Sequence, residues 1–160
     1  MQWWRDKRVN TQFLGHTDQL PALFDLLIKA DRFPMKPRSD WKQKRAIYII
    51  WIDGKAVHVG RTRNLQGRVR GHVSNSHYSA SFAFKQARRT LSIAASYTPE
   101  NSRSALFARD DFYAEFAKHR AVLQASEITF LEVNNPIDQY LLELYAAMAL
   151  GLELDEFDTH

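Results

Sequence analysis

The chain of 160 residues contains no cysteine. This absence excludes disulfide bonds and thiolate metal sites, and it fits a reducing compartment. The sequence also lacks any apolar run near the ~20 residues that a membrane-spanning helix needs. Its first residues, MQWWRDKRVN, carry charges where a signal peptide has an apolar core. We therefore expect a cytoplasmic protein that does not use a membrane.

Acidic residues are missing from a long central stretch, between Asp53 and Glu100. Basic residues recur through it: Arg61, Arg63, Arg68, Arg70, Lys85, Arg88 and Arg89. Such a block raises the local positive potential and attracts polyanions, chiefly nucleic acid. A solvated basic face without a partner is the alternative. Acidic residues gather instead near the end of the sequence, at Glu153, Asp155, Glu156 and Asp158.

The composition is that of one soluble globular domain, with 45% hydrophobic and 25% charged residues. A chain of this length can bury roughly two-thirds of the surface that it exposes when unfolded. We find no internal repeat and no low-complexity segment. We divide the chain into an arm and first helix, residues 1–44, and a main part, residues 45–160, within a single compact domain.

A β-hairpin is the clearest element in the sequence. Residues 46–52, AIYIIWI, are apolar, β-branched and aromatic throughout, which is typical of a strand buried on both faces. Asp53-Gly54 favours positive φ at both turn positions and so predicts a tight hairpin. Residues 55–59 then form the partner strand, which ends at Gly60.

The remaining elements follow from apolar periodicity and turn residues. Helices are predicted over residues 20–30, 65–73, 81–92, 109–124 and 137–150, and a third strand over 127–133. Residues 1–17 are interpreted as a loosely packed arm, and residues 33–42 and 97–103 as connections. The order predicts an α/β sandwich in which a small three-stranded antiparallel sheet is flanked by helices.

Several polar side chains are expected to converge beside the hairpin. Tyr48 and His58 lie on neighbouring strands, and Gly60 lets the backbone approach a phosphate because no Cβ intrudes. Arg68 and His72 are four residues apart, on one face of the next helix and at the rim of its apolar stripe. Each residue taken alone also has a structural interpretation, as a core aromatic, a core histidine or a surface charge.

Glu143 is a second clue, because it lies on a small, apolar face of the last predicted helix. An isolated buried carboxylate costs several kcal/mol. It therefore needs a partner, which could be an arginine, a proton or a divalent cation with oxygen ligands. A buried Arg–Glu pair and a metal site both remain open at this stage.

These motifs together resemble the core of the GIY-YIG nucleases. AIY at 46–48 and HVG at 58–60 match the two family motifs in type, spacing and strand position. Arg68 and His72 fall where the family has an arginine and commonly a histidine. HYSASFAFKQARR, from His77, is similar to the next helix region of the family. The glutamate of the final helix corresponds to Glu143, so the resemblance spans about residues 45–160.

The sequence departs from the family pattern at three places. Ala46 replaces the glycine of the first motif, and His58 replaces the tyrosine of the second. Asp155 stands nearest to the place where the family often has an asparagine.

The resemblance implies a metal-dependent endonuclease that hydrolyses DNA phosphodiester bonds around one Mg²⁺ or Mn²⁺, held by Glu143. Tyr48 would be the general base, with its phenol pKa lowered by nearby positive charge. Arg68 would bind the scissile phosphate, while His58 and His72 would orient or relay protons.

The resemblance also indicates the partners and the surface that contacts them. Duplex DNA is the expected partner, without an organic cofactor, and the protein is expected to be a monomer or a weak homodimer. The residues expected to contact nucleic acid are Gly60, Arg61, Arg63, His77, Lys85, Arg88 and Arg89.

Two other functions fit the same sequence. One is a binding module with a nuclease fold that grips nucleic acid without cutting it, an alternative to which the departures at His58 and Asp155 point. The other is an unrelated α/β domain whose basic face binds an acidic protein. A divalent metal requirement for cleavage separates the nuclease from the binding module.

Overall fold

A four-stranded antiparallel sheet lies at the centre of the protein, whose computed structural model describes residues 10–153. Its strands are β1 (Phe33–Pro34), β2 (Ala46–Ile52), β3 (Lys55–Thr62) and β4 (Glu127–Glu132). Their order across the sheet is β1-β4-β2-β3, so β3 is an edge strand. The β2–β3 hairpin closes at Asp53 and Gly54, with φ of 50° and 75°, as the predicted turn requires.

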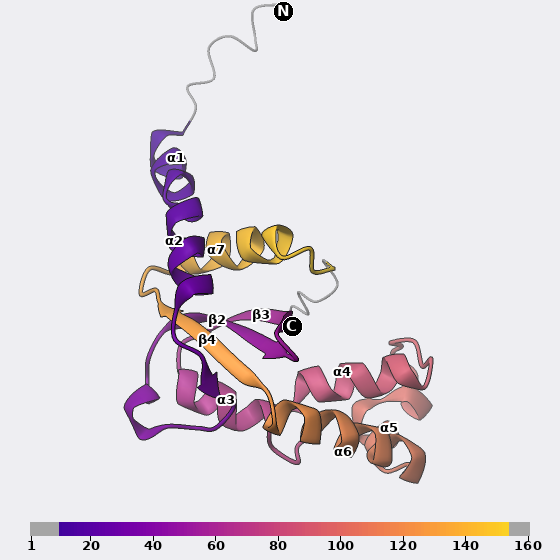
Figure 1. Ribbon diagram of the computed structural model, residues 1–160. Coiled ribbons are helices and arrows are strands. Elements are labelled where there is room, and N and C mark those ends of the chain that lie inside the picture. Colours follow the sequence, from indigo (N-terminus) through magenta and orange to yellow (C-terminus); the bar gives the residue numbers. More distant parts are fainter. Residues whose placement is uncertain (1–9, 154–160) are drawn as a thin grey trace, which may run out of the picture.

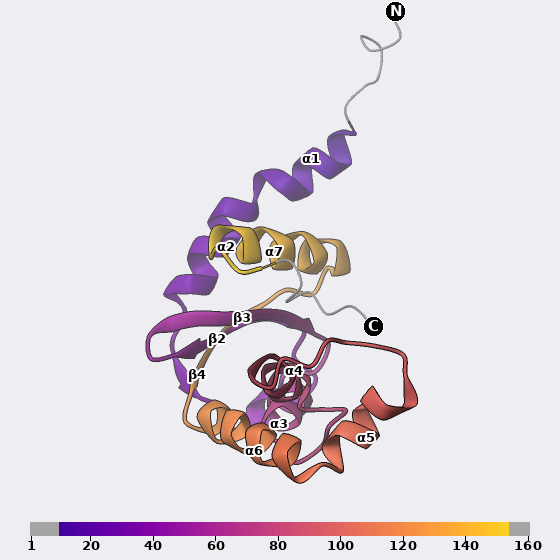
Figure 2. The ribbon, with the colours of Figure 1, turned by 90° about the vertical axis from the view of Figure 1, so that its right-hand side faces the viewer.

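Helices cover both faces of this sheet (Figures 1 and 2). The helices are α1 (Thr11–Asp18), α2 (Leu20–Lys29), α3 (Leu65–His72), α4 (Ser81–Thr90), α5 (Arg103–Phe107), α6 (Asp110–Gln124) and α7 (Pro136–Ala149). Two 3₁₀ turns, η1 (Ser39–Trp41) and η2 (Pro99–Asn101), complete the elements. Helices α2 and α7 lie on one side of the sheet, and α3, α4 and α6 lie on the other. Within residues 10–153, no helix is long and apolar enough to cross a membrane.

The alternation of side chains along β2 builds two hydrophobic cores. Ile47, Ile49 and Trp51 pack with α2 and α7, whereas Tyr48 and Ile50 pack with α3, α4 and α6. Successive side chains of a strand point to opposite faces, so one apolar strand supplies both layers. This explains why residues 46–52 read as continuously apolar. Leu20 and Leu27 of α2 join the second core, so residues on both sides of position 44 share it.

The fold class is α/β, with an antiparallel sheet flanked by helices, and the sheet has four strands where three were predicted. The additional strand, β1, pairs Phe33 with Ile128 of β4 inside the segment interpreted as a connection. Phe33 packs edge-on against Trp41, with ring centroids 5.4 Å apart. A strand of two residues shows no alternation in the sequence, and contacts with distant aromatic residues hold it in place.

Two short helices also lie where the sequence predicted none. Residues 11–18, within the predicted arm, form α1, which Asn10 caps by accepting a hydrogen bond from the Phe13 amide. Residues 1–9 of that arm lie outside the described residues. The connection predicted at 97–103 contains η2, and α5 begins at its last residue.

Several predicted ends also move by one or more residues. Strand β3 continues past Gly60 to Thr62, because Arg61 and Thr62 still pair with β2. Helix α4 ends at Thr90, two residues early, and α3 ends at His72 with Val73 as its C-cap.

Candidate functional site

Tyr48 is the centre of the candidate site, and Gly60 decides where its ring lies. The two residues face each other across β2 and β3. A Cβ built on Gly60 would come within 2.5 Å of the Tyr48 hydroxyl and 2.6 Å of Cζ. The tyrosine ring therefore occupies the space that any other residue at position 60 would fill. Gly60 was predicted to let a phosphate approach, but here its missing side chain makes room for Tyr48.

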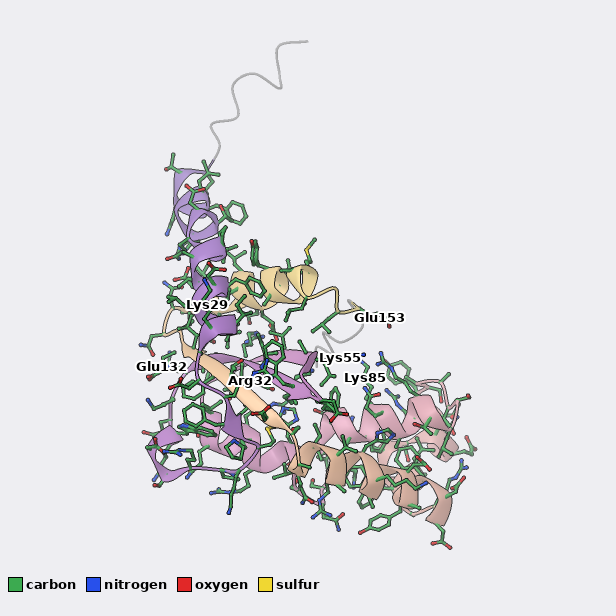
Figure 3. All side chains as sticks on the ribbon, viewed as in Figure 1. Lys29, Arg32, Lys55, Lys85, Glu132 and Glu153 are labelled. Atoms are coloured by element: carbon green, nitrogen blue, oxygen red, sulfur yellow. The ribbon has the colours of Figure 1, made fainter. Side chains whose placement is uncertain are left out.

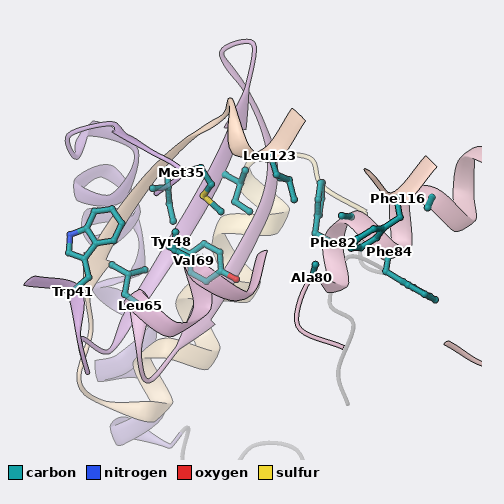
Figure 4. Packing of buried hydrophobic residues seen from close by; sticks show 14 of the residues in the cluster. Met35, Trp41, Tyr48, Leu65, Val69, Ala80, Phe82, Phe84, Phe116 and Leu123 are labelled. Carbon is teal, nitrogen blue, oxygen red and sulfur yellow. The ribbon is translucent and has the colours of Figure 1, made fainter. Parts of the chain in front are cut away.

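The Tyr48 hydroxyl gathers three of the predicted site residues around one oxygen. The Arg68 Nε donates to it at 2.9 Å, and the His72 Nε2 lies 2.8 Å from it. The His58 Nε2 is more distant, at 3.5 Å. Strands β2 and β3 and helix α3 contribute these groups, and Tyr48 itself is only 1% exposed in the core around Val69 (Figure 4).

Burial sets the protonation state of this cluster. It raises the pKa of the Tyr48 phenol, and the opposing effect of the Arg68 guanidinium is smaller. The predicted net lowering of this pKa was therefore wrong: the positive charge of Arg68 does lower it, but burial raises it by more. Burial, reinforced by Arg68, also lowers the pKa of His72 well below its usual range and that of His58 to about 3. At neutral pH the cluster holds a neutral phenol, two neutral imidazoles and one guanidinium.

Both histidines turn the same ring nitrogen, Nε2, toward the Tyr48 hydroxyl. The Nδ1 atoms of His58 and His72 are buried and have no hydrogen-bond partner among residues 10–153. Their Nε2 atoms face the Tyr48 hydroxyl. A proton exchanged between the phenol and either ring would thus pass through Nε2.

Glu143, on α7, has Arg61 as its partner. The Arg61 Nε donates to the Glu143 Oε2 at 3.1 Å, and the Glu143 side chain is 18% exposed. The same guanidinium lies 3.9 Å above the centroid of the Tyr140 ring. Burial nevertheless raises the pKa of Glu143, because the opposing effects of Arg61 and Arg68 are smaller. Of the partners that the sequence left open, the structure contains the arginine.

The Tyr48 and Glu143 groups lie on opposite faces of the edge strand β3. Arg61 pairs with Ile47 and so faces the α7 layer, whereas Gly60 pairs with Tyr48 on the α3 layer. The tyrosine hydroxyl reaches over Gly60 toward the sheet edge. Glu143 is close enough to raise the pKa of both Tyr48 and Arg68. The two groups therefore form one electrostatic site around the edge of the sheet.

An open cleft of about 360 Å³ runs along α3 beside Arg68. Its lining consists of Thr62, Arg63, Asn64, Gly67, Arg68, Gly71 and Ser79. The two glycines are four residues apart, so they lie on the same face of α3, where neither adds a side chain to the cleft wall. A polyanion could lie along this face, between two arginines.

Of this lining, sequence reasoning had named Arg63 and Arg68 as site residues and missed the others. The spacing of Gly67 and Gly71 was a visible signal, because they share a helix face with Asn64. Ser81 accepts a hydrogen bond from the Arg68 Nη2 through its Oγ at 3.4 Å. This contact depends on how α3 packs on α4, so no pattern in the sequence could predict it.

The other residues predicted to contact nucleic acid are dispersed. Arg63 is exposed at the cleft, and Lys85 is close enough to help lower the pKa of His58. His77 instead stacks on Tyr78 and Phe107, with ring centroids 4.1 and 4.9 Å away.

The two arginines of the last turn of α4 have other neighbours. Arg88 lies 5.8 Å from the centroid of the Phe84 ring, and Arg89 lies 3.8 Å from Glu153. Asp155 lies outside the described residues.

The donor set suits a metal ion only in part. Residues 10–153 contain no group of three or more histidine or carboxylate side chains that could hold an ion. Magnesium commonly binds through one or two carboxylates, with water and substrate phosphate completing its shell. Glu143 fits that mode, because it is a half-buried carboxylate at the sheet edge, beside Arg68.

Comparisons of this chain with protein-family models, with curated proteins and with solved structures find no match.

Proposed function

We propose that this protein is a metal-dependent endonuclease that hydrolyses DNA phosphodiester bonds by a GIY-YIG-type mechanism. The observation that carries the proposal is the Tyr48 hydroxyl, held by Arg68 at 2.9 Å and by His72 at 2.8 Å. A buried phenol with one cationic donor and one neutral imidazole is arranged to give up a proton and to be stabilised as it does so. A tyrosine that only filled the core would need a single partner for its hydroxyl.

Tyr48 acts as the general base through a relay, because its pKa is raised and it is neutral at rest. As water attacks the phosphorus, the phenol oxygen takes the water proton and passes its own proton to the His72 Nε2. The P–O bond to the leaving oxygen breaks, and that oxygen is protonated from solvent. Arg68 donates to the phenol oxygen throughout and so offsets its developing negative charge.

Arg68 and Arg63 position the substrate. Both residues line the open cleft along α3, where a phosphodiester backbone would lie between them. Contacts of this kind hold the backbone without reading the base sequence. Lys85, on the neighbouring helix α4, extends the positive potential toward His58.

Glu143 is the residue that would hold Mg²⁺ or Mn²⁺. When bound, the ion would polarise the phosphate and stabilise the leaving oxygen. Arg61 keeps the carboxylate oriented toward the sheet edge through its contact at 3.1 Å.

Replacing Glu143 tests the metal assignment. Wild type and Glu143→Gln are incubated with supercoiled plasmid and labelled duplex DNA, in Mg²⁺, in Mn²⁺ or in EDTA. We expect wild type to cut only with a divalent ion and the variant to lose at least 100-fold in rate, since amide oxygen binds such ions poorly. The fold should persist because glutamine keeps the size of the side chain and a hydrogen-bonding oxygen for Arg61.

Glu132→Gln is the matched control. Glu132 also pairs with a cation, Lys44 at 2.9 Å, but at an exposed position of β4. This control should cut like wild type. Cleavage unchanged in Glu143→Gln, or equal cleavage by wild type in EDTA, would overturn the metal assignment.

A second candidate function is nucleic-acid binding without cleavage. The observation that favours it is the Arg61–Glu143 pair, because a carboxylate already held by a guanidinium binds a cation less readily. It predicts measurable DNA affinity with no cutting in any divalent ion, and no change of affinity in Glu143→Gln.

A further inference from the structure

A second groove lies on the other side of Phe82 from the Tyr48 cluster. It has a volume of about 360 Å³ and a mainly apolar lining, in which Arg89 is the one arginine. Its lining consists of Ile52, Ala56, Val57, Phe82, Gln86, Arg89, His119, Val122 and Leu152. The ring of Phe82 contacts that of His58 edge-on, with centroids 5.5 Å apart. The groove therefore adjoins the candidate site without belonging to it.

The chain enters this groove after α7. Gly151 has a φ of 66° and ends the helix, and the Leu152 amide then donates to the Ala147 carbonyl. This turn brings Leu152 into the groove lining and Glu153 to within 3.8 Å of Arg89 on α4. Figure 3 shows Glu153 and Lys85 on the same side of the molecule, where α7 ends and α4 begins. Residues 154–160 thus start at the rim of the groove.

The composition of that segment complements the groove. Residues 154–160, LDEFDTH, contain three acidic residues, no lysine and no arginine, and two apolar side chains, Leu154 and Phe157. Helix α4 carries Lys85, Arg88 and Arg89 and no acidic residue. Seven extended residues span about 23 Å, which exceeds the roughly 15 Å length of this ten-residue helix.

We propose that residues 154–160 dock in this groove and compete with nucleic acid for α4. Phe157 fills the apolar floor beside Phe82, and Asp155, Glu156 and Asp158 face the basic side chains of α4. The segment is then an acidic mimic of the phosphodiester backbone that these side chains would otherwise attract. The competition rests on the proposed function, whereas docking of the segment does not.

The test compares two variants of the full chain with equal net charge. One is Asp155→Asn/Glu156→Gln/Asp158→Asn. The other is Asp18→Asn/Asp25→Asn/Asp31→Asn, which removes three exposed acidic residues on or next to α1 and α2. Duplex DNA affinity is measured by fluorescence anisotropy in EDTA, over a range of salt concentrations. We expect the first variant to bind about fivefold more tightly than the second, with a steeper salt dependence.

Docking itself is measured without DNA. A fluorescein-labelled peptide of residues 153–160, ELDEFDTH, is titrated with the first variant, and its amide analogue QLNQFNTH is the control. We expect the acidic peptide to bind, the analogue to bind at least tenfold more weakly, and Phe157→Ala in the peptide to weaken binding as well. No peptide binding, or equal DNA affinity of the two variants, would overturn the proposal. The peptide result stands even if the protein cuts no DNA.

Discussion

Tyr48 shows at the scale of one residue how two opposing effects decide a mechanism. Positive charge from Arg68 lowers the pKa of the phenol, and burial raises it by more. A tyrosine that is neutral at rest cannot take a proton unless it gives one up in the same step. His72 makes this possible, because its Nε2 lies 2.8 Å away on a ring that burial keeps neutral.

Tyr48→Phe should abolish cleavage and leave DNA affinity within twofold of wild type. The change removes the group that relays the proton, a contribution of about 10²–10⁴ in rate. Affinity is spared because Tyr48 is only 1% exposed and does not line the cleft that would hold the backbone. The measurement is a single-turnover rate with Mg²⁺, together with anisotropy in EDTA.

Tyr140→Phe provides the comparison, because Tyr140 is exposed on α7 and contacts Arg61 with its ring. It should keep the wild-type rate. A Tyr48→Phe variant that cuts at the wild-type rate would remove Tyr48 from the mechanism.

The identities of the candidate site residues were accessible from sequence, and their electrostatics were not. Spacing and strand pattern were enough to single out Tyr48, His58, Arg68 and His72. The direction of the Tyr48 pKa shift depends on how completely α3 and α4 enclose the ring, and no local pattern encodes this enclosure. The pairing of Glu143 with Arg61 likewise joins residues 82 positions apart.

At the scale of elements, strong local signals explain what was predicted correctly. The β2–β3 hairpin has a positive-φ turn between two apolar strands, and Asn64 caps α3 through its side chain. The irregularity between Ile50 and Trp51 left no such signal. It inserts one extra residue in β3, so that His58 pairs with Ile50 and shares a face with Tyr48.

Gly60→Ala should disable the site by displacing the tyrosine ring. The new methyl group would lie 2.5 Å from the hydroxyl oxygen, too close for the ring to stay in place. Overpacking of this kind costs about 1–3 kcal/mol of stability. We expect a matching fall in the free energy of unfolding and at least a tenfold loss of cleavage.

Gly15→Ala is the control, because nothing lies within 4 Å of a Cβ built at that position of α1. It should stabilise the helix slightly and leave cleavage unchanged. If Gly60→Ala matched this control in urea unfolding, Gly60 would not be what accommodates the Tyr48 ring.

At the scale of the whole molecule, the site joins two helical layers across the edge of the sheet. Helix α7 brings Glu143 from one side, and α3 brings Arg68 and His72 from the other. Each layer has its own core, so the distance between the two halves of the site depends on how both pack on β2. Sequence patterns predict each layer but carry no measure of their relative position.

Buried histidines also make the stability of the whole fold depend on pH. In the unfolded chain a histidine has a pKa of about 6.5, whereas burial lowers that of His58 to about 3. The unfolded state therefore binds more protons between these values. The stabilisation is complete above pH 6.5 and is lost as the pH falls toward 3.

His58→Tyr should make the fold less sensitive to acid. Between pH 7 and pH 5, a histidine that titrates only when unfolded removes about 2 kcal/mol of stability. The replacement has no group that titrates in this range, and its ring can still pack against Phe82. Urea unfolding of both proteins at the two pH values gives the difference directly. An equal loss in wild type and variant would show that His58 is solvated enough to protonate in the folded protein.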